Sequence, residues 1–279
     1  MKGLGKMPRA LRARLRDAPA EALSRLVTAA IDREVDAVLI AGDLYNGTDR
    51  NLTAQVKLRD QLRRLDQVGI RTLIVAGNHD PLGSLCRGVA LPESVHVFGP
   101  EPAPVILTRD SEVLAHIYGV SYAKSATYSN LAEQFPRPSG PFNIAMLHTN
   151  VGDRPDFARY APCRLDDLVN SGYDYWALGH VHRREIVCQD PWIVFPGNIQ
   201  GRHARETGAK GATLVTVEDG SVRALEEREL DVVRWTQCAV DATEATSAHE
   251  VVERVRAALE VQAESIGDRL LAARVELRG

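Results

Sequence analysis

Four short apolar runs in this chain each stop at a polar side chain of a kind that binds metals. The runs cover residues 35–41, 72–76, 142–147 and 173–178. They lead into Gly42-Asp43, Gly77-Asn78-His79-Asp80, His148 and Gly179-His180-Val181-His182. A helical pattern over 52–67 separates the first two runs, and strand–helix–strand alternation is typical of an α/β fold with parallel strands. In such folds the functional site lies where the carboxyl ends of the strands meet.

Other patterns complete the predicted organisation. A helix precedes the first run, with apolar residues at its 3.6-residue period, and the Arg-rich segment 8–16 is interpreted as a charged helix face. Further strands are predicted at 113–118, 193–195 and 212–217. Beyond Leu230 follow a short strand, a helix over 248–264 and a strand over 271–277. We therefore expect one domain over 1–230 and the start of a second over 231–279.

Composition excludes several classes of protein. Apolar residues make up 44% of the 279 residues and charged residues 25%, as in ordinary globular domains. The four cysteines form no Cys-x-x-Cys pair, which argues against a disulfide scaffold or a zinc knuckle and suits a reducing cytoplasm. No apolar run approaches the ~20 residues that span a bilayer. A net charge of -3 leaves nucleic acid open as a partner, because a local groove can still be basic.

The polar strand ends predict a metal centre. Oxygen and imidazole donors without thiolate suit Mn²⁺, Fe or Zn²⁺, and a carboxylate can bridge two such ions ~3.5–4 Å apart. Taken singly, an Asp after Gly can belong to a turn and a lone His can be a core residue. The pair in Gly-His-Val-His is expected to project from one side of an extended chain. The predicted metal ligands are Asp43, Asn78, His148, His180 and His182.

The order of these motifs resembles the calcineurin-like metallophosphoesterase superfamily. Residues 195–203, followed by 206–211, are similar to the bacterial DNA repair exonuclease branch, the SbcD- and YhaO-like nuclease subunits. The resemblance covers about residues 2–230. It implies a two-sheet sandwich flanked by helices, with a partial C-terminal cap. It also implies that Asp43 bridges two metals, that Asn78, His148 and His180 complete one site, and that His182 belongs to the other.

The resemblance further implies a function and partners. His79 would be the catalytic residue that faces the scissile phosphate, with Asp80 orienting it. Two divalent ions, foremost Mn²⁺, would support hydrolysis of DNA phosphodiesters. The partners would be DNA and an SMC-like coiled-coil ATPase, the subunit could form a homodimer, and no membrane is involved.

One departure from the family pattern keeps alternatives open. The family begins with Asp-x-His at the end of its first strand, and this chain offers no match for it. We therefore expect the first strand to be missing, and the second ion to keep only Asp43 and His182. A small-substrate phosphoesterase and an incomplete subunit that binds DNA or the ATPase without cutting remain alternatives. Basic residues near the motifs either grip DNA or form ordinary surface; they are Arg183, Arg184, Arg202, Arg205 and Lys210.

Overall fold

The structure is a computed structural model that describes residues 8–45, 51–85, 88–152, 154 and 158–279. The chain divides into two compact units. One contains the described residues up to Leu23 together with Asn198–Ala212 and Arg228–Gly279; the other contains Ser24–Gly197 and Thr213–Glu227. The domain boundary expected after Leu230 stays a prediction.

A small parallel sheet opens the larger unit. It contains β1 (Ala37–Ala41), β2 (Arg71–Val75) and β3 (Val95–Val97) in that spatial order. Between β1 and β2 runs α2 (Leu52–Asp66), which starts where the Asn51 side chain accepts the backbone N–H of Ala54. One face of α2 is buried through Leu58, Leu62 and Leu65.

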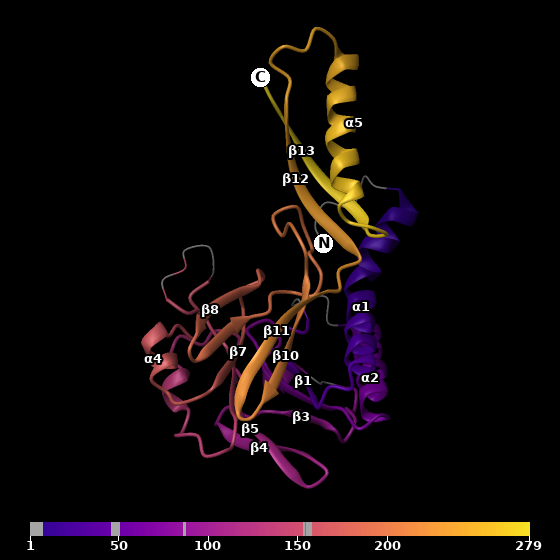
Figure 1. Cartoon of the computed structure of the whole chain (residues 1–279). Helices are drawn as coiled ribbons and strands as arrows, with labels where there is room; N and C mark the ends of the chain where they lie inside the picture. The colour runs from indigo at the N-terminus through magenta and orange to yellow at the C-terminus, as the bar shows by residue number, and fades with distance from the viewer. Residues whose placement is uncertain (1–7, 46–50, 86–87, 153, 155–157) are drawn as a thin grey trace. The chain divides into compact units, whose positions relative to one another are not determined.

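The second sheet of this unit has six strands in the order β4-β5-β6-β7-β9-β8. Its four central strands are mutually parallel, and an antiparallel strand closes each edge. Figure 1 labels β4, β5, β7 and β8 of this sheet. The strands are β4 (Ala103–Arg109), β5 (Glu112–Val120), β6 (Asn143–His148), β7 (Tyr175–Gly179), β8 (Glu185–Gln189) and β9 (Trp192–Phe195).

Alternation along the central strands builds two cores, because successive side chains point to opposite faces of a sheet. Met146 and Ala177 pack between the two sheets, against Leu73 and Val75 of β2. The residues next to them in the sequence pack on the other face of the six-stranded sheet. These are Leu147, Trp176 and Leu178. Two packed sheets with flanking helices confirm the predicted α/β sandwich.

Shorter elements complete the larger unit. They are α3 (Leu82–Leu85), the 3₁₀ helix η3 (Ala132–Gln134) and α4 (Leu165–Val169). The strands β10 (Gly211–Glu218) and β11 (Ser221–Glu229) form a two-stranded sheet whose central residues also belong to this unit. Their apolar side chains Val215, Val222 and Leu225 pack against the core between the sheets.

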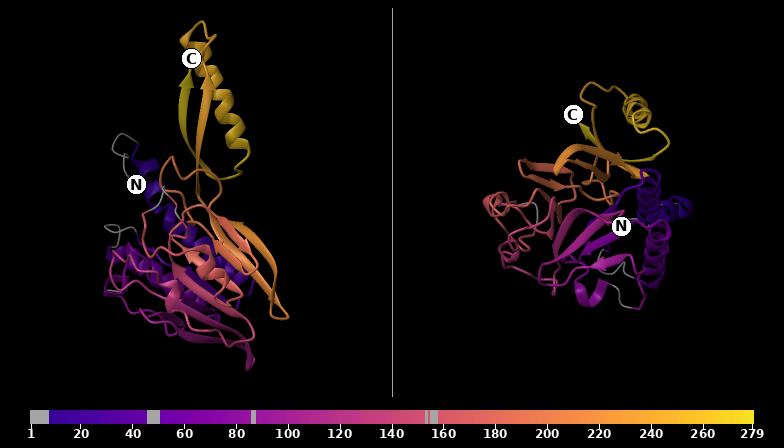
Figure 2. Two further views of the ribbon diagram at one scale, coloured as in Figure 1. Left: turned by 90° about the vertical axis from the view of Figure 1, so that its left-hand side faces the viewer. Right: turned by 60° about the horizontal axis from the view of Figure 1, so that its bottom comes forward.

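The smaller unit is built on the N-terminal part of α1 (Arg9–Asp32) and a C-terminal strand–helix–strand segment. That segment consists of β12 (Val233–Asp241), α5 (Ala248–Glu264) and β13 (Leu270–Arg278), and its two strands pair in parallel. Figure 2 shows α5 lying along this strand pair. The core of the unit includes Leu15, Ala18 and Ala22 of α1 with Val232 and Val233.

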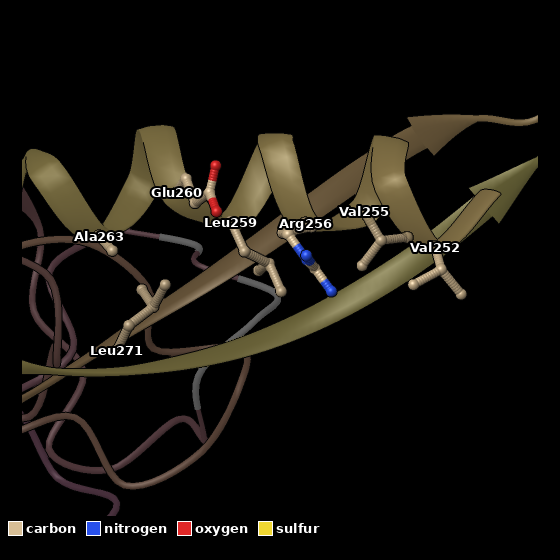
Figure 3. Close-up of a pocket in the computed structure, with 7 residues that line it drawn as sticks. All are labelled: Val252, Val255, Arg256, Leu259, Glu260, Ala263 and Leu271. Carbon is tan, nitrogen blue, oxygen red and sulfur yellow. The ribbon is translucent and has the colours of Figure 1, made fainter. Parts of the chain in front are cut away.

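The helix α5 leaves an apolar groove against β13. Val252, Val255 and Leu259 of the helix and Leu271 of the strand line it (Figure 3). No helix in the described ranges is both long and apolar enough to cross a bilayer.

Candidate metal centre

The predicted ligands lie in the larger unit, at the carboxyl ends of β1, β2, β6 and β7. His148 is the last residue of β6 and shares the strand face of Met146, which points between the two sheets. Gly179, the last residue of β7, lies on that face too, because it is two residues after Ala177. Strand alternation therefore aims this imidazole at the loops that follow β1 and β2.

Glycine residues let these strand ends approach each other. A Cβ on Gly179 would lie 1.7 Å from the carbonyl oxygen of Ala41, and a Cβ on Gly77 would lie 2.3 Å from Asp43 Oδ1. At Gly42, which has φ +90°, a Cβ would lie 2.5 Å from His148 Nδ1. Only glycine permits such contacts. The glycine before each of three predicted ligand motifs is thus required by close packing of backbone and side chains across the two sheets.

Three donor atoms converge at this packed edge. His148 Nε2 lies 3.1 Å from Asn78 Oδ1 and 3.4 Å from Asp43 Oδ2. Its other ring nitrogen lies 2.9 Å from the carbonyl oxygen of Ala41, a contact that orients metal-binding histidines in proteins. In the described residues no three His, Cys, Asp or Glu side chains gather closely enough to hold an ion. The Asn78 amide completes the set, so two oxygens and an imidazole nitrogen fit a divalent ion.

His180 lies beside this group in a conformation that the sequence did not predict. Its ring centroid is 5.2 Å from that of His148, and its Nε2 is 2.9 Å from the carbonyl oxygen of Ala158. Its φ is +101°, so the expected extended chain through His180 and His182 is wrong. Asp43 also has a positive φ, of 55°. Strained backbone of this kind is concentrated at functional sites.

The remaining predicted residues lie around the convergent donors. His182 is partly buried. His79 is exposed, and its backbone N–H donates to Asp43 Oδ1 over 3.0 Å. The structure thus brings Asp43, Asn78 and His148 together directly. His180 is in ring contact with His148, and His182 and His79 lie close enough to affect the pKa of His148.

Burial favours the neutral form of His148 and His180. It lowers the pKa of fully buried His148, an effect that the Asp43 carboxylate partly offsets. Burial, followed by the proximity of His148, lowers the pKa of His180 to about 4. Neutral imidazole is the form that binds metals, so burial of these two rings favours metal binding at neutral pH.

Asp80 has a different role from the one expected. Its carboxylate accepts the backbone N–H groups of Asp43, Tyr45 and Gly77, over 3.1, 3.3 and 3.0 Å. It therefore joins the loop after β1 to the loop after β2, whereas the sequence predicted that it orients His79. Burial raises the pKa of Asp80 to about 7, and the hydrogen bond from Gly77 opposes that shift.

A second supporting residue was missed entirely. The buried ring of Tyr122 packs edge-on against His148, with centroids 5.6 Å apart. The backbone N–H of Tyr122 donates to the carbonyl of Ala76, next to the Gly77 turn. No spacing or motif in the sequence signals this contact, because it depends on the pairing of distant strands.

The basic residues near the motifs differ in exposure. Arg183 and Arg205 are exposed, whereas Arg184 is partly buried and pairs with Glu227. Lys210 is only 7% exposed, and its backbone carbonyl accepts the N–H groups of Leu230 and Asp231. Lys210 therefore belongs to the interior of the smaller unit rather than to a surface that grips DNA.

Comparison with known proteins shows the family of the chain. The calcineurin-like phosphoesterase family matches residues 16–184, a range that contains Asp43, Asn78, His148, His180 and His182. The chain belongs to the calcineurin-like phosphoesterase family. Residues 235–279 match the middle domain of metallophosphoesterase YhaO. Members of this family are metal-dependent hydrolases of phosphate esters, so the chain is expected to require divalent ions.

The relatives of this chain within the family include YhaO and Mre11 proteins. The uncharacterised metallophosphoesterase YhaO of Bacillus subtilis is 38% identical over 90% of this chain and 63% of its own length. The DNA double-strand break repair protein Mre11 of Sulfurisphaera tokodaii is 25% identical, over 76% of this chain and 57% of that protein. Mre11 of Haloferax volcanii is 27% identical, over 85% and 51%. The chain thus spans roughly half to two thirds of the length of these relatives.

Proposed function

We propose that this calcineurin-like phosphoesterase is a DNA nuclease of the exonuclease type. The observation that carries the proposal is the convergence of Asp43, Asn78 and His148 at one sheet edge, in a family whose relatives include Mre11 break-repair proteins. Phosphodiester hydrolysis needs charge neutralisation at the phosphate and an activated water. Two divalent ions, which we propose to be Mn²⁺, would supply both when bound.

The residues of the chain have separate tasks in this proposal. Asp43 would be shared by both ions, Asn78, His148 and His180 would complete the first site, and His182 would serve the second. The exposed imidazole of His79 would donate a hydrogen bond or a proton to the phosphate oxygens. Asp80 holds the two ligand loops together through backbone hydrogen bonds. Its carboxylate thereby fixes the positions of Asp43 and Asn78 relative to each other.

The proposed partners follow from the resemblance and from the relatives. We propose DNA as substrate because Mre11 proteins are named for DNA double-strand break repair. We also propose that the protein binds an SMC-like coiled-coil ATPase and forms a homodimer. Co-purification with such an ATPase and sedimentation of the protein alone test them separately.

A nuclease assay with defined ends tests the function. We expect the protein to shorten end-labelled linear DNA with Mn²⁺, more weakly with Mg²⁺, and to be inactive after chelation. His79→Ala should abolish shortening. Equal activity in Mg²⁺ with no response to Mn²⁺ would refute the metal assignment.

Two outcomes of the same assay separate the alternatives. Hydrolysis of p-nitrophenyl phosphate or free nucleotides without DNA cleavage would favour a small-substrate phosphoesterase. DNA binding without hydrolysis of any ester would favour a subunit that binds without cutting. Either result overturns the proposed nuclease.

A further inference from the structure

We propose that Tyr128, stacked on Tyr160, forms a platform for an unpaired terminal base of the DNA substrate. This inference rests on the proposed nuclease function. It adds to the metal centre a residue that distinguishes single-stranded DNA ends from paired ones. The platform lies in the larger unit, beside His180.

The exposure of Tyr128 is unusual for this molecule. The residue is 69% exposed, the highest fraction among the exposed large hydrophobic residues in the described ranges. One face of its ring stacks on Tyr160, with centroids 6.0 Å apart and planes 28° apart. Because most of the side chain is in contact with water, an aromatic face is available for another planar group.

The platform is connected to the metal centre by a second aromatic contact. Tyr160 meets the ring of His180 edge-on, with centroids 6.1 Å apart and planes 83° apart. Two ring contacts therefore separate the open face of Tyr128 from a predicted metal ligand. A group stacked on the open face of Tyr128 would therefore be separated from His180 by the rings of Tyr128 and Tyr160, and it would leave the metal centre itself free for the phosphate.

Backbone hydrogen bonds hold both tyrosines in position. The N–H of Ala161 donates to the carbonyl of Thr127 over 2.8 Å, which joins the two tyrosine-bearing segments. The N–H of Tyr160 donates to the carbonyl of Ala158 over 2.8 Å. That same carbonyl lies 2.9 Å from His180 Nε2. One short segment therefore positions the platform and the predicted ligand together.

A nucleobase suits this arrangement better than a polar group. Aromatic side chains stack on any base, because every base has a π face, so they bind single strands without sequence preference. An enzyme that removes successive nucleotides needs such tolerance. Bases inside a duplex are paired and stacked already, so the platform would favour single-stranded or frayed ends.

Substitutions at Tyr128 and a matched DNA substrate test the platform. We expect Tyr128→Leu to lower kcat/KM on single-stranded ends by about 10-fold or more, as loss of one base stack does. Tyr128→Phe should retain activity because its ring face remains. Ile106→Ala, an exposed apolar residue of β4, should have no effect. DNA with an abasic terminal nucleotide should be cut equally by wild type and Tyr128→Leu.

Other outcomes would overturn the platform. Equal cleavage of normal ends by wild type and Tyr128→Leu would refute it while leaving the nuclease function intact. An equal loss in Tyr128→Phe would assign the effect to the hydroxyl instead of the ring. If wild type cuts no DNA, the nuclease proposal fails. Binding of DNA with terminal 2-aminopurine then decides the platform, because stacking on wild type, but not on Tyr128→Leu, should quench its fluorescence.

Discussion

The edge of the sheets that carries the candidate metal centre and the C-terminal segment of β12, α5 and β13 are packed very differently. At the sheet edge, His148 is fully buried and backbone atoms approach so closely that three glycines are required. In α5, none of the 17 residues is buried, and Val252 is 53% exposed although it lines the groove against β13. The sheet edge is therefore tightly packed, whereas α5 is loosely packed.

The difference in packing matches a difference in how precisely each region must be positioned. Metal ligands must be held within fractions of an ångström, so the loops at the sheet edge are fixed by glycine contacts and by Asp80. A single helix on a two-stranded sheet buries little apolar surface and is marginally stable by itself. Substitutions should therefore have large effects at the sheet edge and small effects in α5.

The largest effect is expected for Gly179→Ala. The new methyl group would lie 1.7 Å from the carbonyl oxygen of Ala41, so β7 must move away from β1. We expect a loss of about 3–5 kcal/mol in the free energy of unfolding, together with loss of activity. Gly83→Ala is the matched control, since nothing lies within 4 Å of its Cβ position. Urea unfolding that finds the two variants equally stable would contradict the dense packing.

His79→Ala should separate activity from stability. The side chain is exposed, so the unfolding free energy should change by less than about 0.5 kcal/mol. Loss of a proton donor or hydrogen bond at the phosphate should lower kcat by ~10²–10⁴. His249→Ala, at an exposed histidine of α5, should leave kcat unchanged. Elemental analysis should find metal retained in both variants, and loss of metal from His79→Ala would assign that residue as a ligand.

Metal binding should stabilise the sheet edge and not α5. Mn²⁺ at about 100 times its dissociation constant should add ~2.7 kcal/mol to the unfolding free energy, because only the folded chain presents the converged donors. Asn78→Ala should remove most of this gain, whereas Leu259→Ala should retain it. The measurement is thermal unfolding with and without Mn²⁺. An equal gain in all three proteins would place the ion elsewhere.

Among the apolar substitutions, the smaller loss of stability is expected in α5. Leu259 lines the half-exposed groove, so Leu259→Ala should cost about 1 kcal/mol. Leu178→Ala removes a fully buried side chain of β7 and should cost about 3 kcal/mol. Equal costs in urea unfolding would mean that α5 is packed as tightly as the sheet core.

Local patterns in the sequence predicted much of the fold correctly. The helix predicted over 248–264 coincides with α5, and the apolar runs correspond to β1, β2, β6 and β7. These elements have strong periodicity or β-branched content, which acts over neighbouring residues. The strands β3, β4, β8 and β11 were not predicted. In β4, Pro104 argues against a strand interior. The end of β11 is a run of charged residues, Glu226 to Glu229, which are depleted in strands.

The candidate site could also be predicted only in part from the sequence. The residue types and the order of Asp43, Asn78, His148, His180 and His182 could be read from the sequence, since each follows a recognisable strand. Tertiary structure alone determined the positive φ of His180, the role of Asp80 and the stack of Tyr128 on Tyr160. Asp80 and the loop after β1 are 37 residues apart, and the two tyrosines are also distant in sequence. Contacts of this kind exist only after the sheets have packed, so no local pattern encodes them.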